Sequence, residues 1–373
     1  MTRPAHMLFA GALLVALLAV APSGQRVEAQ ATPLDTCSLP EVQAAFAATP
    51  AYQPTSMPGW VEVENNYFVI DGTVFTPQGV NYYPSRSPWR RFLTETNIVQ
   101  MEQELDMIAS AGFNTLRIYL WNDALFQCPG SGAVPNPPAF QILDAVLQRA
   151  AVRGMRVIVT LNDMPDLETY PLYSNPQHVQ AQTRYIVSRY ANEPAIMAWD
   201  LRNAGDIDYG IENDMQGQFT RGQVLNWLAS TAALVRSIDS RHLITAGWAF
   251  DSAATAPHVD FISFAHWSKD TDELRGRLLS LAAATRKPIV LTAFGYSTFE
   301  LSEEEQRDLI QRAINVVEDY DAAGYVLWTA FDFPLDATCT PPACPSEDSR
   351  EHHFGLWRWD FSPKPALEII AAG

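Results

Sequence analysis

The segment AWDLRNAGDIDYG, residues 198–210, passes from apolar to polar residues in the way that a buried strand does where it ends at a polar site. Arg202 and Asn203 supply a cation and an amide at this strand end, and Gly and Asp residues follow. Many barrel enzymes keep a catalytic carboxylate at such a position. The next residue is Ala204, whose methyl group takes no part in proton transfer. The segment therefore indicates a polar site from which an acid is missing.

Other β-rich runs also end in aromatic and hydrogen-bonding residues. Flat aromatic rings stack on the C–H faces of sugars, while amide and guanidinium groups bond to hydroxyls, so such a rim is typical of a neutral saccharide site. Any one Trp has core packing as an equal alternative. The strand ends carry Asn81, Tyr82, Tyr83, Arg117, Tyr119, Trp121, Asn162, Asp163, Trp248, His266, Trp267, Ala293, Phe294, Gly295, Trp328, Phe331 and Asp332.

Phosphate, metal and cofactor sites are not indicated by these residues. A phosphate site would need Lys and a helix N-terminus, and a metal site would need several His or acidic residues that converge. His266 stands alone at its strand end, and His352 and His353 have no obvious partners. We therefore expect no cofactor and no metal.

Eight β-rich runs alternate with helical patterns along the chain. Regular alternation of this kind predicts a (β/α)8 barrel. A doubly wound open sheet is the rival, but the chain has no GxGxxG or GxxxxGK turn. Alternating apolar residues around Asp71-Gly72 predict a short N-terminal hairpin, and 249–259 is too short for a full helix. The strands are expected at 78–83, 114–121, 156–161, 196–203, 242–248, 260–267, 288–295 and 324–331, and the helices at 98–112, 140–154, 178–191, 223–238, 273–285, 303–324 and 364–372.

The N-terminus has the features of a secretory signal peptide. Arg3 precedes an apolar run from Leu8 to Ala21, and small residues follow up to Ala29. The run is short for a membrane-spanning helix, although an N-terminal anchor is the alternative. We expect a signal peptide at 1–29, a tether rich in Ala, Pro, Thr and Gln at 30–60 and the barrel at 61–373. The mature protein is then secreted, either extracellular or periplasmic.

The charge balance and the cysteines fit an exported protein. Without residues 1–29 the chain holds 23 basic and 41 acidic residues, a balance that repels nucleic acid and anionic membrane surfaces. We expect a monomer that binds neutral glycans, and neither nucleic acid nor membrane after signal removal. An even cysteine count after a signal peptide suggests two disulfides. We pair Cys339 with Cys344 across the Pro-rich turn, and then Cys37 with Cys128.

Together these motifs resemble glycoside hydrolase family 5, the cellulase and β-mannanase group of the clan A retaining hydrolases. The resemblance covers roughly residues 61–370, and the motifs lie in the expected order. They are NTLRI at 114–118, WDLRNA at 199–204, SFAHW at 263–267, KPIVLTAFG at 287–295, Trp328, and the closing GL…PKPA between 355 and 366.

The resemblance also defines where this chain departs from the family. The family places its acid/base Glu after the fourth-strand Asn and its nucleophilic Glu on the seventh strand, and these positions are Ala204 and Ala293. Asn162 stands where many members have His. The resemblance implies that Arg117, Asn203, His266 and Trp328 shape the central subsite, that Tyr83, Trp121, Trp248 and Trp267 are sugar platforms, and that Asn162 contacts substrate.

Retaining hydrolysis needs two carboxyl groups about 5–5.5 Å apart, so the chain is expected to bind β-linked glucan or mannan without hydrolysing it. Substitute groups would have to be placed within about 3–3.5 Å of the reacting atoms, which disfavours Asp206, Asp208, Glu212, Asp163, Asp332 and Tyr296. Three explanations stay open: a natural glycan-binding pseudoenzyme, a double Glu-to-Ala variant that traps substrate, and a barrel with other chemistry.

Overall fold

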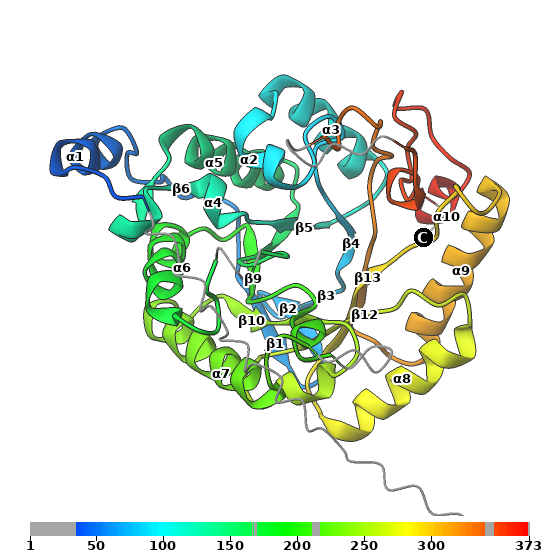
Figure 1. Cartoon of the computed structure of the whole chain (residues 1–373). Helices are drawn as coiled ribbons and strands as arrows, with labels where there is room; N and C mark the ends of the chain where they lie inside the picture. Colours follow the sequence, from blue (N-terminus) through cyan, green and yellow to red (C-terminus); the bar gives the residue numbers. More distant parts are fainter. Residues whose placement is uncertain (1–34, 166, 168–169, 211–216, 340–346, 372–373) are drawn as a thin grey trace, which may run out of the picture. The chain divides into compact units, whose positions relative to one another are not determined.

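Parallel strands of mostly buried residues form the centre of the molecule (Figure 1). The computed structural model describes residues 35–371 except 166, 168–169, 211–216 and 340–346, so the expected signal peptide lies outside the described residues. In the described residues the sheet has the order β10-β9-β8-β5-β4-β14-β13-β12-β11. Its strands are β4 (Gln78–Asn81), β5 (Thr115–Tyr119), β8 (Arg156–Thr160), β9 (Ile196–Asp200), β10 (Leu243–Thr245), β11 (Gly247–Trp248), β12 (Ile262–Ala265), β13 (Ile289–Phe294) and β14 (Gly324–Leu327).

The two end strands of this sheet are neighbours in the chain, and this closes the barrel. β10 pairs with β9 and β11 pairs with β12, and Ala246 alone separates β10 from β11. The two pieces therefore act as one interrupted fifth strand. The eight strand positions agree with the eight runs that the sequence predicts, and the expected (β/α)8 barrel is confirmed.

Helices lie between the strands and cover the outside of the barrel. Their ends follow local signals: Asn97 accepts hydrogen bonds from Val99 N and Gln100 N at the start of α3, and Ser302 with Glu305 forms a capping box at α9. The α-helices are α1 (Leu39–Ala47), α2 (Phe92–Glu95), α3 (Ile98–Ser110), α4 (Asn122–Leu125), α5 (Pro137–Val152), α6 (Pro176–Tyr190), α7 (Arg221–Ile238), α8 (Thr271–Ala284), α9 (Glu303–Asp319) and α10 (Leu367–Ala371). Short 3-10 turns are η1 (Trp89–Arg91), η2 (Pro129–Ser131), η3 (Gly205–Tyr209), η5 (Ser252–Thr255) and η6 (Arg350–His352).

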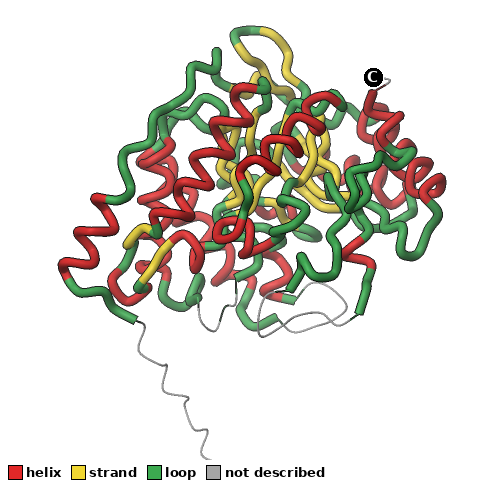
Figure 2. The backbone as a smooth tube through the Cα atoms, turned by 90° about the horizontal axis from the view of Figure 1, so that it is seen from above, coloured by secondary structure: helices red, strands yellow, loops and turns green. Residues whose placement is uncertain are grey.

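A small antiparallel sheet covers the N-terminal end of the barrel (Figure 2). It consists of β1 (Val61–Glu64), β2 (Tyr67–Ile70) and β3 (Thr73–Phe75). The predicted hairpin is the β2–β3 pair, whose turn residues Asp71 and Gly72 both have positive φ. Phe68 packs edge-on against Phe261, the residue before β12, with ring centroids 5.1 Å apart. This end of the barrel is thus closed by apolar packing, and the opposite end is left for a site.

The segment expected to be a tether is instead packed on the barrel in its described part, residues 35–60. Two of its side chains donate to the buried Glu193 carboxylate, Tyr52 from Oη at 2.8 Å and Thr55 from Oγ1 at 2.6 Å. Tyr52 is buried and packs edge-on against Tyr190. The composition of the segment suggested a linker because its anchoring residues are few and far apart in the sequence.

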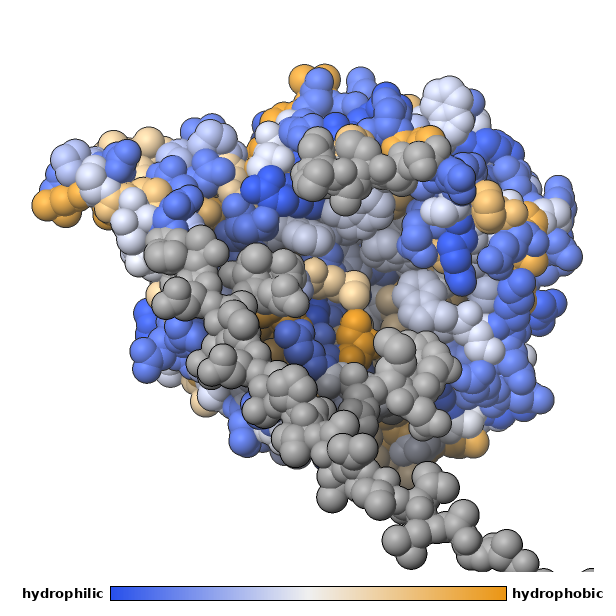
Figure 3. All heavy atoms as spheres, in the orientation of Figure 1, coloured by the Kyte–Doolittle hydropathy of each residue, from blue (hydrophilic) through white to orange (hydrophobic). Residues whose placement is uncertain are grey.

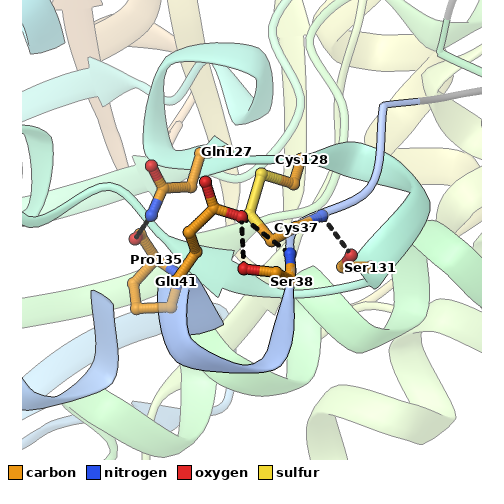
Figure 4. Close-up of a disulfide and its surroundings, with 7 residues drawn as sticks. All are labelled: Cys37, Ser38, Glu41, Gln127, Cys128, Ser131 and Pro135. Carbon is orange, nitrogen blue, oxygen red and sulfur yellow. Dashed lines mark hydrogen bonds between the residues drawn. A yellow bond between two sulfur atoms is a disulfide. The ribbon is translucent and has the colours of Figure 1, made fainter. Parts of the chain in front are cut away.

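A disulfide holds the start of the segment 35–60, which we call the N-terminal arm (Figure 4). Cys37 is bonded to Cys128 with a Cα–Cα distance of 5.4 Å, as predicted. Cys128 follows β6 (Phe126–Gln127), which pairs with β7 (Val134–Pro135), and Ser131 accepts a hydrogen bond from Cys37 N at 2.8 Å. Cys339 is also disulfide-bonded. Its predicted partner, Cys344, lies outside the described residues.

Candidate functional site

A buried ion pair forms the centre of the polar residues at the C-terminal ends of the strands. Arg117 on β5 donates from Nη2 to Asp200 Oδ2 on β9 at 2.6 Å and from Nε to the same oxygen at 3.0 Å. Both side chains are almost fully buried, at 1% and 0% exposed. A buried charge is tolerated when it is paired and hydrogen-bonded in this way. The pair therefore fixes the guanidinium in one orientation.

Hydrogen bonds extend this pair across the strand ends. Arg117 Nη1 donates to Tyr119 Oη at 2.8 Å, and Nη2 donates to Asn203 Oδ1 at 3.0 Å. Asn203 Nδ2 in turn donates to Asp163 Oδ1 at 2.8 Å. Asn81 accepts a short bond from Tyr119 and donates to three backbone carbonyls of β13 and β14. We call Asn81, Arg117, Tyr119, Asp163, Asp200 and Asn203 the polar frame.

Asp163 is the carboxylate of this frame that also reaches the open side of the barrel. Its Oδ2 accepts from Tyr83 Oη at 2.7 Å, and Trp121 Nε1 donates to the same hydroxyl at 2.9 Å. Burial raises the pKa of Asp163, although the bonds from Tyr83 and Asn203 act in the other direction. Both carboxylate oxygens are thus engaged as acceptors, and the group serves to orient Asn203 and Tyr83.

Four alanines lie together beside the polar frame. Ala204, Ala249, Ala265 and Ala293 form one apolar cluster, and they follow or belong to the fourth to seventh barrel strands. The two positions at which the family resemblance expects carboxylates are thus brought into one cluster. The four side chains of this alanine cluster are methyl groups, which neither donate nor accept a proton.

The backbone at Ala204 has an uncommon conformation for a non-glycine residue. Its φ and ψ are 47° and 39°, in the left-handed region, where an L-residue costs roughly 1–2 kcal/mol. A hydrogen bond from Ala204 N to Gly247 O at 2.8 Å holds it there. Strained residues of this kind concentrate at functional sites.

An open cleft of about 630 Å³ lies over the frame and the cluster. Figure 3 shows the face of the molecule on which this end of the barrel is hollowed. The cleft combines aromatic rings with a few polar groups, which is the usual composition of a small-molecule site. Its lining residues are Trp89, Tyr119, Trp121, Asp163, Met164, Asn203, Trp267, Ala293, Trp328, Arg350, Glu351 and Phe354.

Three residues expected to contact substrate are buried and do not line this cleft, and their contact with substrate stays a prediction. Trp248 is 0% exposed and packs edge-on against Tyr209. Tyr83 is 1% exposed, with its ring stacked on Tyr119 at 5.2 Å. Asn162 is also buried, and its Nδ2 donates to Leu201 O at 3.0 Å. It lines a smaller hollow that shares Trp121 and Asp163 with the cleft. The packing around Trp248 and Tyr83 therefore accounts for their burial at the strand ends.

Arg117 and His266 lie near the cleft without lining it. Arg117 acts through Asn203 and Tyr119, as described above. His266 is 2% exposed and lines a neighbouring hollow. Burial and the positive charge of Arg277 lower the pKa of His266, so the ring is neutral at neutral pH. Of the residues expected at the site, Trp121, Asn203, Trp267, Ala293 and Trp328 line the cleft.

The candidate substitute acids near Ala204 have structural partners. Asp206 accepts hydrogen bonds from the backbone N–H groups of Ala249, Phe250 and Asp251. Asp208 forms a buried ion pair with Arg202 at 2.9 Å. Each carboxylate is therefore committed to holding a loop. Glu212 lies outside the described residues.

Asp332 and Tyr296, the other two groups considered as replacements for the missing carboxylates, are also unsuited to that role. Asp332 pairs with Lys364 Nζ at 2.8 Å and accepts from Gly355 N at the same distance, which fixes the chain near the cleft wall. Tyr296 is buried, and burial raises the pKa of Tyr296 to about 12. A tyrosine with such a pKa is a poor nucleophile at neutral pH. In the part of the chain that the structure describes, no three His, Cys, Asp or Glu side chains are placed to hold a metal ion.

The sequence-based prediction missed the wall that Arg350, Glu351 and Phe354 form. Arg350 lies 5.4 Å from the ring centroid of Phe354, which lies 6.1 Å from that of Trp267. The cleft wall desolvates the Glu351 carboxyl and raises its pKa, although the residue as a whole is exposed. Trp89 and Met164 were also missed. These residues belong to loops and short 3-10 turns, and no strand pattern marks which of their side chains turn inward.

A family model and a named relative both match this chain. The family model described as GH family 5 beta-mannosidase-like matches residues 177–278. A mannan endo-1,4-beta-mannosidase A from Podospora anserina is 30% identical over 315 residues, which cover 70% of this chain and 78% of the relative.

Solved structures of other proteins have folds similar to that of this chain. A Glu-to-Ala variant of GH5_18 from Streptomyces cattleya, in complex with Manβ1-4GlcNAc, has a TM-score of 0.67 at 21% identity, with 80% of each chain covered. An endo-1,4-beta-mannanase from Rhizomucor miehei has a TM-score of 0.62 at 17% identity and covers 84% of this chain and 100% of the mannanase.

Proposed function

This chain belongs to glycoside hydrolase family 5, and we propose that it binds β-1,4-linked mannosides in its cleft without hydrolysing them. The observation that carries the proposal is the pairing of an intact polar frame with an alanine cluster that includes both Ala204 and Ala293. The frame orients Asn203 at the cleft surface, whereas the cluster offers no group that donates a proton or attacks a sugar. Binding groups are thus present where reacting groups are missing.

The mannoside class is supported by the relatives. The Podospora relative is named as an enzyme that acts on mannan, and the matching family model is described as β-mannosidase-like. Glucan stays the alternative ligand, because the cleft contacts that distinguish the two sugars involve loops. The aromatic residues Trp121, Trp267 and Trp328 provide stacking faces for either sugar, and Asn203 provides hydroxyl contacts.

The loss of hydrolysis follows from the chemistry of the reaction. A retaining enzyme needs one carboxyl group to protonate the leaving oxygen and a second to form the glycosyl–enzyme bond. General acid/base catalysis alone contributes about 10²–10⁴-fold, and the missing nucleophile removes the covalent route as well. The described carboxylates of the cleft are Asp163, which is engaged by Tyr83 and Asn203, and Glu351.

Secretion and a monomeric state belong to the same proposal. The signal-peptide pattern of residues 1–29 and the disulfide at Cys37 support an oxidising, exported location. None of the described helices is long and apolar enough to cross a membrane. The net negative charge supports a neutral glycan partner over nucleic acid.

Calorimetry combined with product analysis tests the proposal on the unchanged protein. Purified protein is titrated with β-1,4-mannotriose and with cellotriose, and each mixture is then incubated for a day and analysed by chromatography. We expect saturable binding of mannotriose, weaker binding of cellotriose and no hydrolysis products. Rapid release of mannose or mannobiose would contradict the non-hydrolytic part of the proposal, and absence of binding to both sugars would contradict the saccharide part.

A further inference from the structure

Two glutamates of the described chain are fully buried, Glu104 on α3 and Glu193 in the turn before β9. Neither forms a salt bridge with a described cation. A glutamate is almost never buried in this way unless its charge is paired, because the carboxylate loses its contact with water. Hydrogen bonds must therefore take the place of the missing cation at both positions.

Four hydrogen bonds hold the Glu104 carboxylate. Tyr82 Oη donates to it at 2.7 Å, Ser85 Oγ at 2.6 Å and Gln100 Nε2 at 2.9 Å. Ser85 N donates the fourth bond, at 3.2 Å. Burial raises the pKa of Glu104, whereas these bonds act in the opposite direction because every partner donates to the charged form. The carboxylate thus ties the residues that follow β4 to helix α3.

Glu193 holds the N-terminal arm with donors of the same kinds. Its carboxylate accepts hydrogen bonds from Tyr52 Oη, from Thr55 Oγ1 and Thr55 N, and from Ala195 N. Both glutamates therefore bind one tyrosine hydroxyl and one hydroxyl residue that donates from its side chain and its backbone. They differ in what they hold, because no described residue of the N-terminal arm lines the cleft, whereas the segment that Glu104 holds reaches it.

That segment, residues 82–91, carries Trp89 to the cleft. Trp89 has a φ of 54°, in the left-handed region that a bulky side chain rarely adopts. Such a conformation persists only where the surrounding structure imposes it. The neighbouring ion pair of Arg90 with Asp123 is largely exposed to solvent and contributes little. The buried anchor of this segment is the bonding of Ser85 to Glu104.

We propose that Glu104 is a positioning residue for the glycan site, which acts through residues 82–91 to hold Trp89 in one orientation against a bound sugar. The proposal rests on the proposed glycan-binding function of the cleft. Glu104 does not line the cleft itself, so its effect on affinity passes through Trp89. Glu193 is its counterpart on the N-terminal arm, where the same kind of anchor stabilises the fold and leaves the cleft unchanged.

Calorimetry on a double-mutant cycle tests this role. The unchanged protein, Glu104→Gln, Trp89→Ala and the Glu104→Gln/Trp89→Ala double variant are each titrated with β-1,4-mannotriose, and thermal unfolding of the same samples is recorded. We expect each single variant to lower affinity by about threefold to tenfold, the range of one aromatic contact. The double variant should bind within about twofold of Trp89→Ala, because the anchor then has no ring to position.

Glu193→Gln is the matched control. Both glutamine variants place an amide donor where donors already point, so both should lower the melting temperature. Glu193→Gln should nevertheless bind mannotriose within about twofold of the unchanged protein. If Glu104→Gln does not fold, Ser85→Ala and Thr55→Val replace the two variants, since each removes one hydroxyl from its anchor. Ser85→Ala should then lower affinity about two- to threefold, and Thr55→Val should leave it unchanged.

The outcomes separate this role from the proposed function. Full affinity in a folded Glu104→Gln or Trp89→Ala variant, an equal loss of affinity in Glu193→Gln, or additive losses in the double variant would each overturn the positioning role. Binding by the unchanged protein would still support the glycan cleft in those cases. Absence of binding by the unchanged protein would overturn the proposed function and, with it, the role of Glu104.

Discussion

The polar frame and the alanine cluster lie side by side at the same end of the barrel and differ in how they are bound to the rest of the protein. Every member of the frame is hydrogen-bonded to another member, and its central pair, Arg117 and Asp200, is almost wholly buried. The alanine cluster contributes only small methyl contacts, and Ala204 even occupies a left-handed backbone conformation.

Under the proposed function, this difference indicates which parts of an active site a fold can lose. Removal of one partner of a buried ion pair leaves an unpaired charge and destabilises the whole protein. Catalytic carboxylates that face an open cleft add little to stability, and sites built for catalysis often reduce it. Replacement of such carboxylates by alanine therefore removes the reaction and leaves the fold, together with the groups that hold a sugar.

The largest expected effect on stability comes from the frame. Arg117→Ala leaves Asp200 buried without its partner, so we expect a loss of about 3–5 kcal/mol in the free energy of unfolding. The matched control is Arg149→Ala, whose partly exposed pair with Glu102 should contribute about 1 kcal/mol or less. Denaturant unfolding followed by circular dichroism measures both. Equal, small losses in the two variants would contradict the distinction between the frame and an ordinary ion pair.

Asp239 and His242 form a buried pair at the end of the barrel opposite the cleft. We expect changes to this pair to affect stability and not glycan binding. Burial acts to raise the pKa of Asp239, but bonds from His242, Trp199 and the Arg241 backbone outweigh it and hold the pKa at about 2. Because this value lies below the ordinary 3.8, the stabilisation is complete above about pH 5 and is lost as the pH falls through 2. It amounts to about 2 kcal/mol.

We therefore expect the free energy of unfolding to fall between pH 5 and pH 2, and Asp239→Asn to make that fall shallower by about 2 kcal/mol. Acid titrations of both proteins at fixed urea concentration measure the difference. Glycan affinity at pH 7 should not change. An unchanged acid profile in Asp239→Asn would show that other carboxylates account for the acid sensitivity.

A smaller effect is expected from the exposed ring of the cleft. Trp267→Ala removes a ring that is 42% exposed and otherwise packs edge-on against Phe354, so stability should fall by about 1–2 kcal/mol. Affinity for mannotriose should fall about five- to tenfold, a loss of about 1–1.4 kcal/mol. Calorimetry and thermal unfolding of the same sample separate these two quantities. A large loss of stability without a loss of affinity would place Trp267 with the packing residues instead.

The sequence was sufficient to predict the barrel because its signals are local. Runs of buried residues at β5, β8 and β9 contain β-forming residues, and caps such as Asn97 and Ser302 mark where helices begin. The motif WDLRNA also located the strand end that carries Asn203 and Ala204. These features depend on residues within a few positions of one another.

Side-chain exposure at the strand ends was harder to predict. Trp248 and Trp267 both follow barrel strands in the sequence, yet one is fully buried and the other is 42% exposed. The difference depends on packing against residues far away in the chain, such as Tyr209 for Trp248 and Phe354 for Trp267. The wall at 350–354 was missed for the same reason, because the buried Lys364–Asp332 pair that fixes it joins residues 32 positions apart.

Restoration of both carboxylates tests most directly whether the two alanines alone separate this protein from a glycosidase. The double variant Ala204→Glu/Ala293→Glu is compared with the unchanged protein and with each single variant, and release of 4-nitrophenol from 4-nitrophenyl β-mannobioside is measured. Because the two carboxylates act as a unit, we expect the double variant to be faster than the unchanged protein by about 10⁴-fold or more, with little gain in either single variant. A folded double variant that binds mannotriose and shows no hydrolysis would contradict the account.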